Sequence, residues 1–335
     1  MAEKTMRDAI NEALHQIFAE DDRVFVIGED VAGGRGGTGE LDCAGGVFGV
    51  TKGLLGRFGE DRVIDTPISE SALIGAAAGA ALTGMRPIAE IMFADLMGVC
   101  FDQIINQIAK FNYMFGGQKN CPVVIRMTTG GGRNAAAQHS QTMYQVMTAF
   151  PGLKVAVPSN AYDAKGMLIA AVRDPDPVLF FEPKILYQDT CEVPDEPYEI
   201  PLGQASMPRE GDDVTVVAFS TMVKYAAEAI DRVAARGQAT CDLIDPRTTS
   251  PLDVESILES VEATGRLVVV DESPPRCGLA ADIAALVAER AFAALKAPVK
   301  TVTAPHTPVP HARELERAYL PGPGKIEKAI EAVLA

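Results

Sequence analysis

The segment Asp65–Glu70, Asp-Thr-Pro-Ile-Ser-Glu, places a single carboxylate between two apolar stretches. A short β-type run, 63–65, leads into it, and the small-residue run 71–84 that follows has helical character. A carboxyl group held between apolar elements can share a proton with a buried ring nitrogen, which is general acid–base chemistry. Glu70 is therefore the first candidate for a catalytic group.

The same glutamate also fits a purely structural role. Ser69 has the side chain of a helix N-cap. A carboxylate in the first turn of a helix also interacts favourably with the helix dipole. The local sequence predicts both roles equally well, so the choice between catalysis and helix stabilisation has to come from other parts of the chain.

His139 is one of four histidines and lies in a segment of small and polar residues, 135–141. The alanines around it leave room for a second molecule to approach the imidazole, which suits a proton donor or acceptor. The alternative is a histidine whose ring is satisfied by a backbone carbonyl. The other three, His15, His306 and His311, have no spacing typical of a metal site.

Two glycine-rich segments suggest phosphate binding at first sight. Gly34, Gly36 and Gly39 form a G-x-G-x-x-G pattern, but five residues separate it from the preceding strand and further glycines follow it. No helix can begin there to hold a pyrophosphate, so the pattern favours a mobile surface loop over a dinucleotide site. The run 129–132 could hold an anion through backbone N–H groups, although no Gly-Lys-Ser/Thr follows it.

Size and composition exclude several functional classes. A chain of 335 residues exceeds the usual limit of one hydrophobic core, which indicates two domains. A net charge of −15 argues against nucleic acid and against anionic membrane surfaces as partners. The six cysteines include no C-x-x-C pair, and no run of 18 apolar residues occurs. We therefore expect reduced thiols, no membrane span and a cytoplasmic location.

Short runs of β-forming residues alternate with helical segments over the first 190 residues. These runs are apolar throughout, which indicates a parallel sheet covered by helices on both faces. Apolar residues at helical spacing predict an amphipathic helix over 6–18. The predicted strands are 24–28, 63–65, 87–93, 122–126, 154–157 and 178–182.

The pattern breaks over residues 191–203, where acidic residues and prolines mix in the manner of an exposed linker. A second alternation follows, with predicted helices near 221–236 and 279–295. Its predicted strands are 213–219, 241–244, 267–270 and 299–302. The sequence thus predicts an α/β protein with two three-layer domains of mostly parallel strands, residues 1–190 and 204–335.

Nine segments taken together resemble the β subunit of the thiamine-diphosphate-dependent 2-oxo acid dehydrogenases. They are 26–30, 65–70, 86–95, 101–106, 137–141, 151–155, 163–166, 181–187 and 245–253. The resemblance runs in order from about residue 5 to the C-terminus. Segments 33–46, 113–117 and 304–310 are most similar to the acetoin dehydrogenase branch. That branch cleaves acetoin, whereas the pyruvate and branched-chain relatives decarboxylate 2-oxo acids.

The resemblance implies a transketolase-like pyrimidine-binding domain, 1–190, and a transketolase-type C-terminal domain, 204–335. It implies thiamine diphosphate shared with an α subunit that holds the diphosphate through Mg²⁺, in an α₂β₂ heterotetramer. The chain lacks the Gly-Asp-Gly…Asn-Asn diphosphate motif, which agrees with this division. A lipoyl-bearing dihydrolipoamide acyltransferase is the implied acceptor of the acyl group.

Site residues follow from the same resemblance. Glu70 would bind the pyrimidine ring nitrogen, Ile68 and Leu96 would contact the pyrimidine, and His139 would face the lipoyl group. Leu96 stands where many relatives have an aromatic residue, so stacking on the ring is replaced by apolar contact. A structural K⁺ is implied near Ala171, Asp174 and Asp176, with an acidic turn at a helix end as the alternative.

Three rival hypotheses remain at this point. One is the pyruvate or branched-chain counterpart of an acetoin enzyme, with the same residues and a different substrate. Another is a non-catalytic α/β binding module, in which Glu70 would be structural only. An NAD-binding oxidoreductase is a third hypothesis, which depends on the glycine pattern at 34–39.

Overall fold

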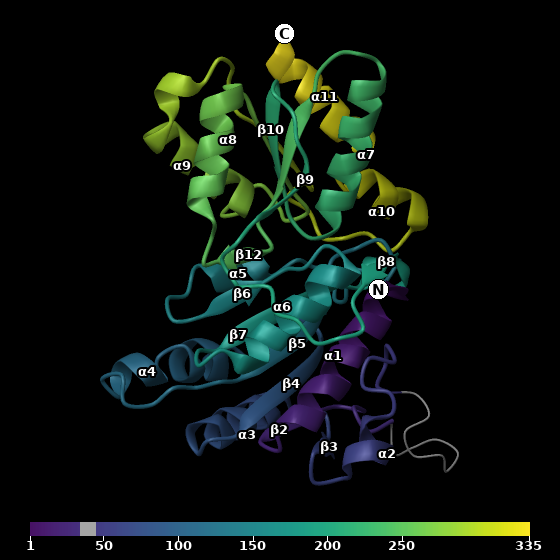
Figure 1. Ribbon diagram of the computed structural model, residues 1–335, viewed down its shortest axis with the longest axis vertical. Helices are drawn as coiled ribbons and strands as arrows, with labels where there is room; N and C mark the ends of the chain where they lie inside the picture. The colour runs from purple at the N-terminus through teal and green to yellow at the C-terminus, as the bar shows by residue number, and fades with distance from the viewer. Residues whose placement is uncertain (34–44) are drawn as a thin grey trace. The chain divides into compact units, whose positions relative to one another are not determined.

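The computed structural model describes residues 1–33 and 45–335, which form two compact units (Figure 1). The first unit comprises 1–129 and 147–202, and the second comprises 130–146 and 203–335. The glycine pattern at Gly34, Gly36 and Gly39 lies outside the described residues, so the predicted surface loop there stays a prediction.

The first unit is built on a parallel sheet. Its strands follow the order β6-β7-β5-β4-β2-β3, and every neighbouring pair among them is parallel. Strands β2, β5 and β7 are buried along their whole length, as expected for a sheet that is covered on both faces. Their residues are mostly apolar, with the exceptions of two threonines and the ion pair of Arg126 and Glu182. The bounds are β2 Val24–Gly28, β3 Val63–Asp65, β4 Arg86–Phe93, β5 Val124–Thr129, β6 Lys154–Ala156 and β7 Val178–Pro183.

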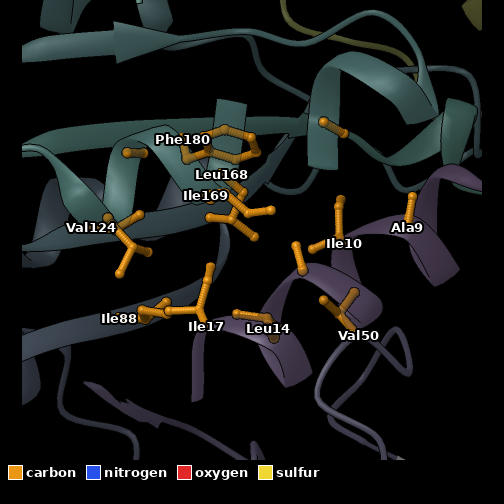
Figure 2. Packing of buried hydrophobic residues seen from close by; sticks show 14 of the residues in the cluster. Ala9, Ile10, Leu14, Ile17, Val50, Ile88, Val124, Leu168, Ile169 and Phe180 are labelled. Carbon is orange, nitrogen blue, oxygen red and sulfur yellow. The ribbon is translucent and has the colours of Figure 1, made fainter. Parts of the chain in front are cut away.

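Helix α1, Met6–Glu20, carries the main apolar face of this unit. Its buried residues are the seven expected from helical spacing, namely Met6, Ala9, Ile10, Ala13, Leu14, Ile17 and Phe18. Figure 2 shows Leu14 and Ile17 on the side of α1 that faces Leu168 of α6. The other helices of the unit are α2 Leu54–Phe58, α3 Glu70–Leu82, η1 Ala94–Cys100, η2 Gln103–Ile108, α4 Phe111–Met114, α5 Tyr144–Thr148, α6 Ala161–Arg173 and η3 Lys184–Gln188. Of these, η1 and η3 are 3₁₀ helices, and η2 is a π-helix. The first residues of α5 belong to the second unit.

Two short strands of the first unit escaped the sequence prediction. Strand β1, Ala2–Thr5, pairs antiparallel with β8, Thr190–Val193. Most of their residues are exposed or half-buried, so neither strand has the continuous apolar run by which the others were found. The predicted strand 122–126 was also displaced, because β5 begins only at Val124. Pro122 has no N–H to donate to a ladder, which favours a later start.

The second unit has a five-stranded sheet in the order β14-β13-β10-β11-β9. Strands β10, β11, β13 and β14 are mutually parallel, and β9 is antiparallel to β11. The α/β class with mostly parallel sheets is thus confirmed. The bounds are β9 Ser206–Arg209, β10 Val214–Ala218, α7 Thr221–Ala235, β11 Cys241–Asp245, β12 Thr248–Ser250, α8 Val254–Thr264, β13 Leu267–Asp271, α9 Leu279–Arg290, η4 Phe292–Ala294, β14 Lys300–Thr303, α10 Arg313–Tyr319 and α11 Pro323–Leu334.

Segment 130–146 groups with the second unit, although the sequence predicted one continuous domain over residues 1–190. The reason lies in hydrogen bonds over long sequence separations. The Tyr144 hydroxyl donates to Asp271 Oδ1 at 2.6 Å, and Gly132 N donates to Glu316 Oε1 at 2.9 Å. No described helix is both long enough and apolar enough to cross a membrane.

A buried ion network crosses the middle of the first sheet. Arg126 on β5 is 2% exposed, and its guanidinium donates to both oxygens of Glu182 on β7 at 2.7 and 2.8 Å. It also donates to Glu90 Oε2 on β4 at 2.8 Å. Burial alone would lower the pKa of Arg126, but the charges of Glu182 and Glu90 raise it instead. Burial raises the pKa of Glu90, and the charge of Arg126 counteracts that rise.

Replacing Arg126 by methionine should lower the free energy of unfolding by about 3–5 kcal/mol, because two buried carboxylates lose their counter-ion. The matched control is Arg290→Met, whose partner Glu255 is 71% exposed, with an expected loss of about 0–1 kcal/mol. Urea denaturation of both variants measures the difference. Equal losses would show that the network contributes no more than a surface pair.

Candidate active site

Glu70 is the first residue of α3, directly after the turn that leaves β3. Two hydrogen bonds fix this turn beside the end of β2. Thr66 N donates to Gly28 O at 2.9 Å, and Ala32 N donates to the Asp65 carboxylate at 2.6 Å. The turn therefore brings Glu70 to the carboxyl edge of the parallel sheet, where ligands bind in open α/β folds.

The predicted capping role of Ser69 is wrong. Ser69 occupies the N-cap position of α3 but makes no side-chain cap hydrogen bond. Its hydroxyl donates to Pro67 O at 3.2 Å instead, with Ser69 at φ −162° and ψ 64°. The turn geometry thus directs the serine away from the helix end, while Glu70 still supplies an acidic group in the first turn.

The Glu70 side chain lies in a largely buried and acidic setting. The residue is 9% exposed. Burial raises the pKa of the Cys100 thiol to about 12, and the negative charge of Glu70 adds to that rise. The pKa of Glu29, the residue after β2, is raised mainly by burial and further by the negative charges of Asp30 and Glu70. Glu29 and Cys100 therefore lie close enough to Glu70 to feel its charge.

The carboxylate of Glu70 accepts no hydrogen bond from any residue that the structure describes, although its oxygens are not among the fully buried polar atoms that lack a partner. Nearby, the Thr66 hydroxyl is buried and likewise has no partner within the described chain. Buried polar groups are almost always hydrogen-bonded, and exceptions call for a ligand or a functional reason. The two groups therefore fit a polar ring system that would bind beside α3.

Apolar side chains stand exposed around this turn. Ile68, two residues before Glu70, is 75% exposed. Val99 is 60% exposed, and its carbonyl accepts a hydrogen bond of 2.6 Å from the Ser71 hydroxyl. Leu96 is half-buried in η1, which directly follows β4. Exposed apolar groups beside a buried carboxylate are typical of a surface that a ligand or another chain covers.

His139 lies in the second unit, in the segment 130–146, and is half-buried. The alanines before it are only half-buried, and the side chain of the neighbouring Ser140 is buried. The Ser140 hydroxyl has no hydrogen-bond partner among the described residues. The structure places Glu70 and His139 in different units.

The glycine run 129–132 does hold anions, but they belong to the chain itself. Gly131 N donates to Glu272 Oε1 at 2.5 Å, and Gly132 N donates to Glu316 Oε1 at 2.9 Å. Both carboxylates are almost fully buried. The anion expected at these N–H groups is therefore a pair of glutamates from the second unit.

The contacts near the predicted K⁺ site do not fit the ion well. Lys154 Nζ lies 2.8 Å from Asp174 Oδ1 and 3.2 Å from Asp176 Oδ2. The Arg86 guanidinium donates to the carbonyls of Val172 and Asp174 at 2.6 and 3.2 Å. Cationic side chains thus already bind these oxygens. The described residues also contain no cluster of three or more His, Cys, Asp or Glu suited to a metal.

Glu29 and Cys100 received no role from the sequence. Glu29 lies within the segment 26–30 and directly follows β2. Because the carboxyl ends of neighbouring parallel strands meet at one edge of a sheet, the proximity of a carboxylate after β2 to one after β3 is a signal that could have been found in the sequence. No local signal identified Cys100, which reaches the site from the end of η1.

Comparison with known proteins agrees with this architecture. Residues 2–190 match the family described as transketolase, pyrimidine binding domain, and residues 203–326 match transketolase, C-terminal domain. A solved structure described as a split gene transketolase, inactive beta4 tetramer, superposes with a TM-score of 0.79 at 25% identity over 98% of both chains. Fold and sequence define a transketolase-type pair of domains.

Curated proteins of similar sequence identify the family within the transketolase-type proteins. The chain is 54% identical to the beta subunit of acetoin:2,6-dichlorophenolindophenol oxidoreductase from Bacillus subtilis, over 96% of this chain and 94% of that one. It is 55% identical to the subunit of the same name from Cupriavidus necator, over 98% and 97%. Identity to the pyruvate dehydrogenase E1 component subunit beta of Rickettsia conorii is 44%, over 98% of both. The chain belongs to the family of β subunits of thiamine-diphosphate-dependent acetoin and 2-oxo acid dehydrogenases.

The burial of Cys100 beside Glu70 predicts slow alkylation of its thiol. With a pKa of about 12, only about one thiol in ten thousand is ionised at pH 8. Cys277 is exposed and serves as the reactive control in the same chain. Iodoacetamide treatment of the native protein followed by peptide mass spectrometry should label Cys277 well before Cys100. Equal labelling rates of Cys277 and Cys100 would contradict the burial of the Cys100 thiol.

Proposed function

We propose that this chain is the β subunit of an acetoin dehydrogenase. Together with an α subunit it splits acetoin into acetaldehyde and an acetyl group, and the acetyl group passes to a lipoyl arm whose disulfide is reduced. The observation that carries the proposal is Glu70, which is 9% exposed at the start of α3 and whose carboxylate accepts no hydrogen bond within the described chain. The identity of 54–55% to two acetoin-oxidising relatives supports the substrate.

Glu70 supplies the acid–base group of the proposed site. When bound, thiamine diphosphate provides a thiazolium carbon that acts as the nucleophile. The Glu70 carboxyl would hold a proton against the pyrimidine ring nitrogen. The buried Cys100 thiol would limit the access of water to that hydrogen bond. Glu29 adds a second acidic group beside it.

Ile68 and Leu96 complete the pyrimidine contact in this proposal. Ile68 projects from the turn before α3 and is largely exposed, so it is available to a ring. Leu96 would cover the ring by apolar contact without aromatic stacking. This substitution affects the affinity for the cofactor and leaves the type of reaction unchanged.

His139 would act in the transfer of the acyl group. As a general acid, its imidazole could protonate a sulfur of the lipoyl ring while the acyl group forms a bond to the other sulfur. The small side chains in the segment 135–141 leave access for a lipoyl-lysine arm. The acyl acceptor of the proposed enzyme is a lipoyl-bearing dihydrolipoamide acyltransferase.

The α subunit is the proposed partner at the exposed apolar side chains Ile68 and Val99. It would hold the diphosphate through Mg²⁺, and two copies of each chain would form an α₂β₂ heterotetramer. The functional domains proposed for this chain are 1–190 and 204–335, joined by 191–203, which the matched ranges 2–190 and 203–326 support. Five free cysteines among the described residues support a cytoplasmic location.

A potassium ion near Ala171, Asp174 and Asp176 stays a prediction of the family resemblance. It would have to compete with the Lys154 ammonium for the carboxylates and with the Arg86 guanidinium for the carbonyls. An ion pair that closes a helix end explains the same acidic turn. No step of the proposed reaction passes through this ion.

Replacing Glu70 by glutamine should lower the rate of acetoin-dependent dye reduction by at least about 100-fold, because general acid–base groups contribute about 10²–10⁴-fold. The assay uses the enzyme reconstituted from both subunits. The matched control is Glu192→Gln, at an exposed position on β8, which should keep the wild-type rate. A Glu70→Gln enzyme that assembles and keeps full activity would show that Glu70 is structural.

The second candidate function is that of a pyruvate dehydrogenase β subunit, which the 44% identity to a relative of that name favours. The two functions share the acid–base residues and differ in the substrate. Dye reduction by the reconstituted enzyme should be faster with acetoin than with pyruvate at equal concentration. Equal or faster turnover of pyruvate would reject the acetoin assignment.

A further inference from the structure

The segment that carries His139 is held by buried acidic residues of the second unit. Asp271 is the last residue of β13, Glu272 follows it, and Glu316 lies in the middle of α10. Asp271, Glu272 and Glu316 are 0%, 5% and 2% exposed, respectively. Burial of three carboxyl groups is costly unless each gains strong hydrogen bonds. The donors come largely from the 130–146 segment itself.

One end of the segment is bound by two of these carboxylates. Glu316 accepts hydrogen bonds from Gly132 N at 2.9 Å, Asn134 N at 2.9 Å and Asn134 Nδ2 at 2.8 Å. Glu272 accepts one from Gly131 N at 2.5 Å. Three backbone N–H groups within four residues therefore end on carboxylate oxygens, a charge-assisted arrangement stronger than neutral hydrogen bonds.

The backbone conformation of this end depends on those bonds. Gly130 and Gly132 have φ of +83° and +93°, while Asn134 and Ala136 have φ of +56° and +61°. Residues with a Cβ rarely adopt such angles unless the surroundings enforce them. A Cβ on Gly130 would lie 3.0 Å from Glu272 Oε2, so the close approach of the carboxylate also requires glycine. The strained turn comes three residues before His139.

The other end of the segment is bound by Asp271. The Tyr144 hydroxyl donates to Asp271 Oδ1 at 2.6 Å, and burial raises the pKa of Tyr144 well above its usual value, so it remains a donor. Asp271 also accepts from Ser273 N at 3.1 Å and from the Ser273 hydroxyl. His139 thus lies between two anchored points, Asn134 and Tyr144.

We propose that Glu316, assisted by Glu272, positions the His139 loop for acyl transfer. In this account the C-terminal unit places the imidazole, although the proposed cofactor residue Glu70 lies in the first unit. Glu316 is a positioning residue, because its carboxylate contacts only the backbone and side chain of the loop in the described bonds. The inference rests on the proposed role of His139.

The test compares two activities of one preparation of the reconstituted enzyme with Glu316→Gln. The isosteric amide keeps the volume of the side chain but puts an NH₂ group against N–H donors of the loop. Acetyl transfer to a free lipoyl domain should fall at least ten-fold, while acetoin-dependent dye reduction, which needs no lipoyl arm, should stay within two-fold. Glu314→Gln, exposed on the same helix, is the matched control and should change neither activity.

Amide hydrogen exchange of residues 131–136 provides a second, independent readout. Exchange in this stretch should become faster in Glu316→Gln and stay unchanged in Glu314→Gln. A merely structural role would lower both activities in proportion, and that result would overturn the inference. So would unchanged exchange together with unchanged acetyl transfer.

His139→Ala separates this inference from the proposed function. If His139→Ala slows acetyl transfer and Glu316→Gln does not, positioning by Glu316 is wrong and the role of His139 stands. If His139→Ala leaves acetyl transfer unchanged, the role of His139 is wrong, and the inference falls with it. Slower transfer in both single variants, with no further loss in the double variant, is the result we expect.

Discussion

The position of Glu70 at the start of α3, without a hydrogen-bond donor in the described chain, is the constraint on which the proposed chemistry depends. Helix α3 begins directly after a turn that is tied to Gly28 of β2 and to Ala32. Glu70 is 9% exposed, and polar groups that are so little exposed are usually hydrogen-bonded. Binding of a polar ring would give its carboxylate a partner.

Other buried carboxylates of this protein, in contrast to Glu70, accept hydrogen bonds from the chain itself. In the first sheet, Arg126 donates to both oxygens of Glu182 and to one oxygen of Glu90, and in the second unit Glu316 accepts hydrogen bonds from a loop. These carboxylates already have partners within the chain. The contrast distinguishes Glu70 from the other buried acids, and it makes a structural role less fitting for Glu70 than for them.

The sequence predicted much of this, and the failures have physical causes. The apolar face of α1 and the buried strands follow from spacing, because a single core selects apolar residues at every inward position. Strands β1, β8 and β9 are short and largely exposed, so they left no such pattern. Ser69 has the residue type of a cap, yet local turn geometry prevents capping.

The site was predicted less completely than the fold. Family resemblance identified Glu70 and His139 as candidates, and the structure adds Cys100 and Glu29 around the first of them. The bond between Asn134 and Glu316 joins residues 182 positions apart, and no local pattern can reveal such a pair. The His139 segment lies within the matched range 2–190, while its contacts group it with the second unit.

The most direct test of the account is the infrared difference spectrum of the reconstituted αβ enzyme with and without thiamine diphosphate. If Glu70 shares a proton with the bound ring, cofactor binding should perturb a carboxyl band in the wild-type enzyme. That band should be missing from the difference spectrum of a Glu70→Gln enzyme that still binds the cofactor. Identical carboxyl bands in the two enzymes would contradict the account.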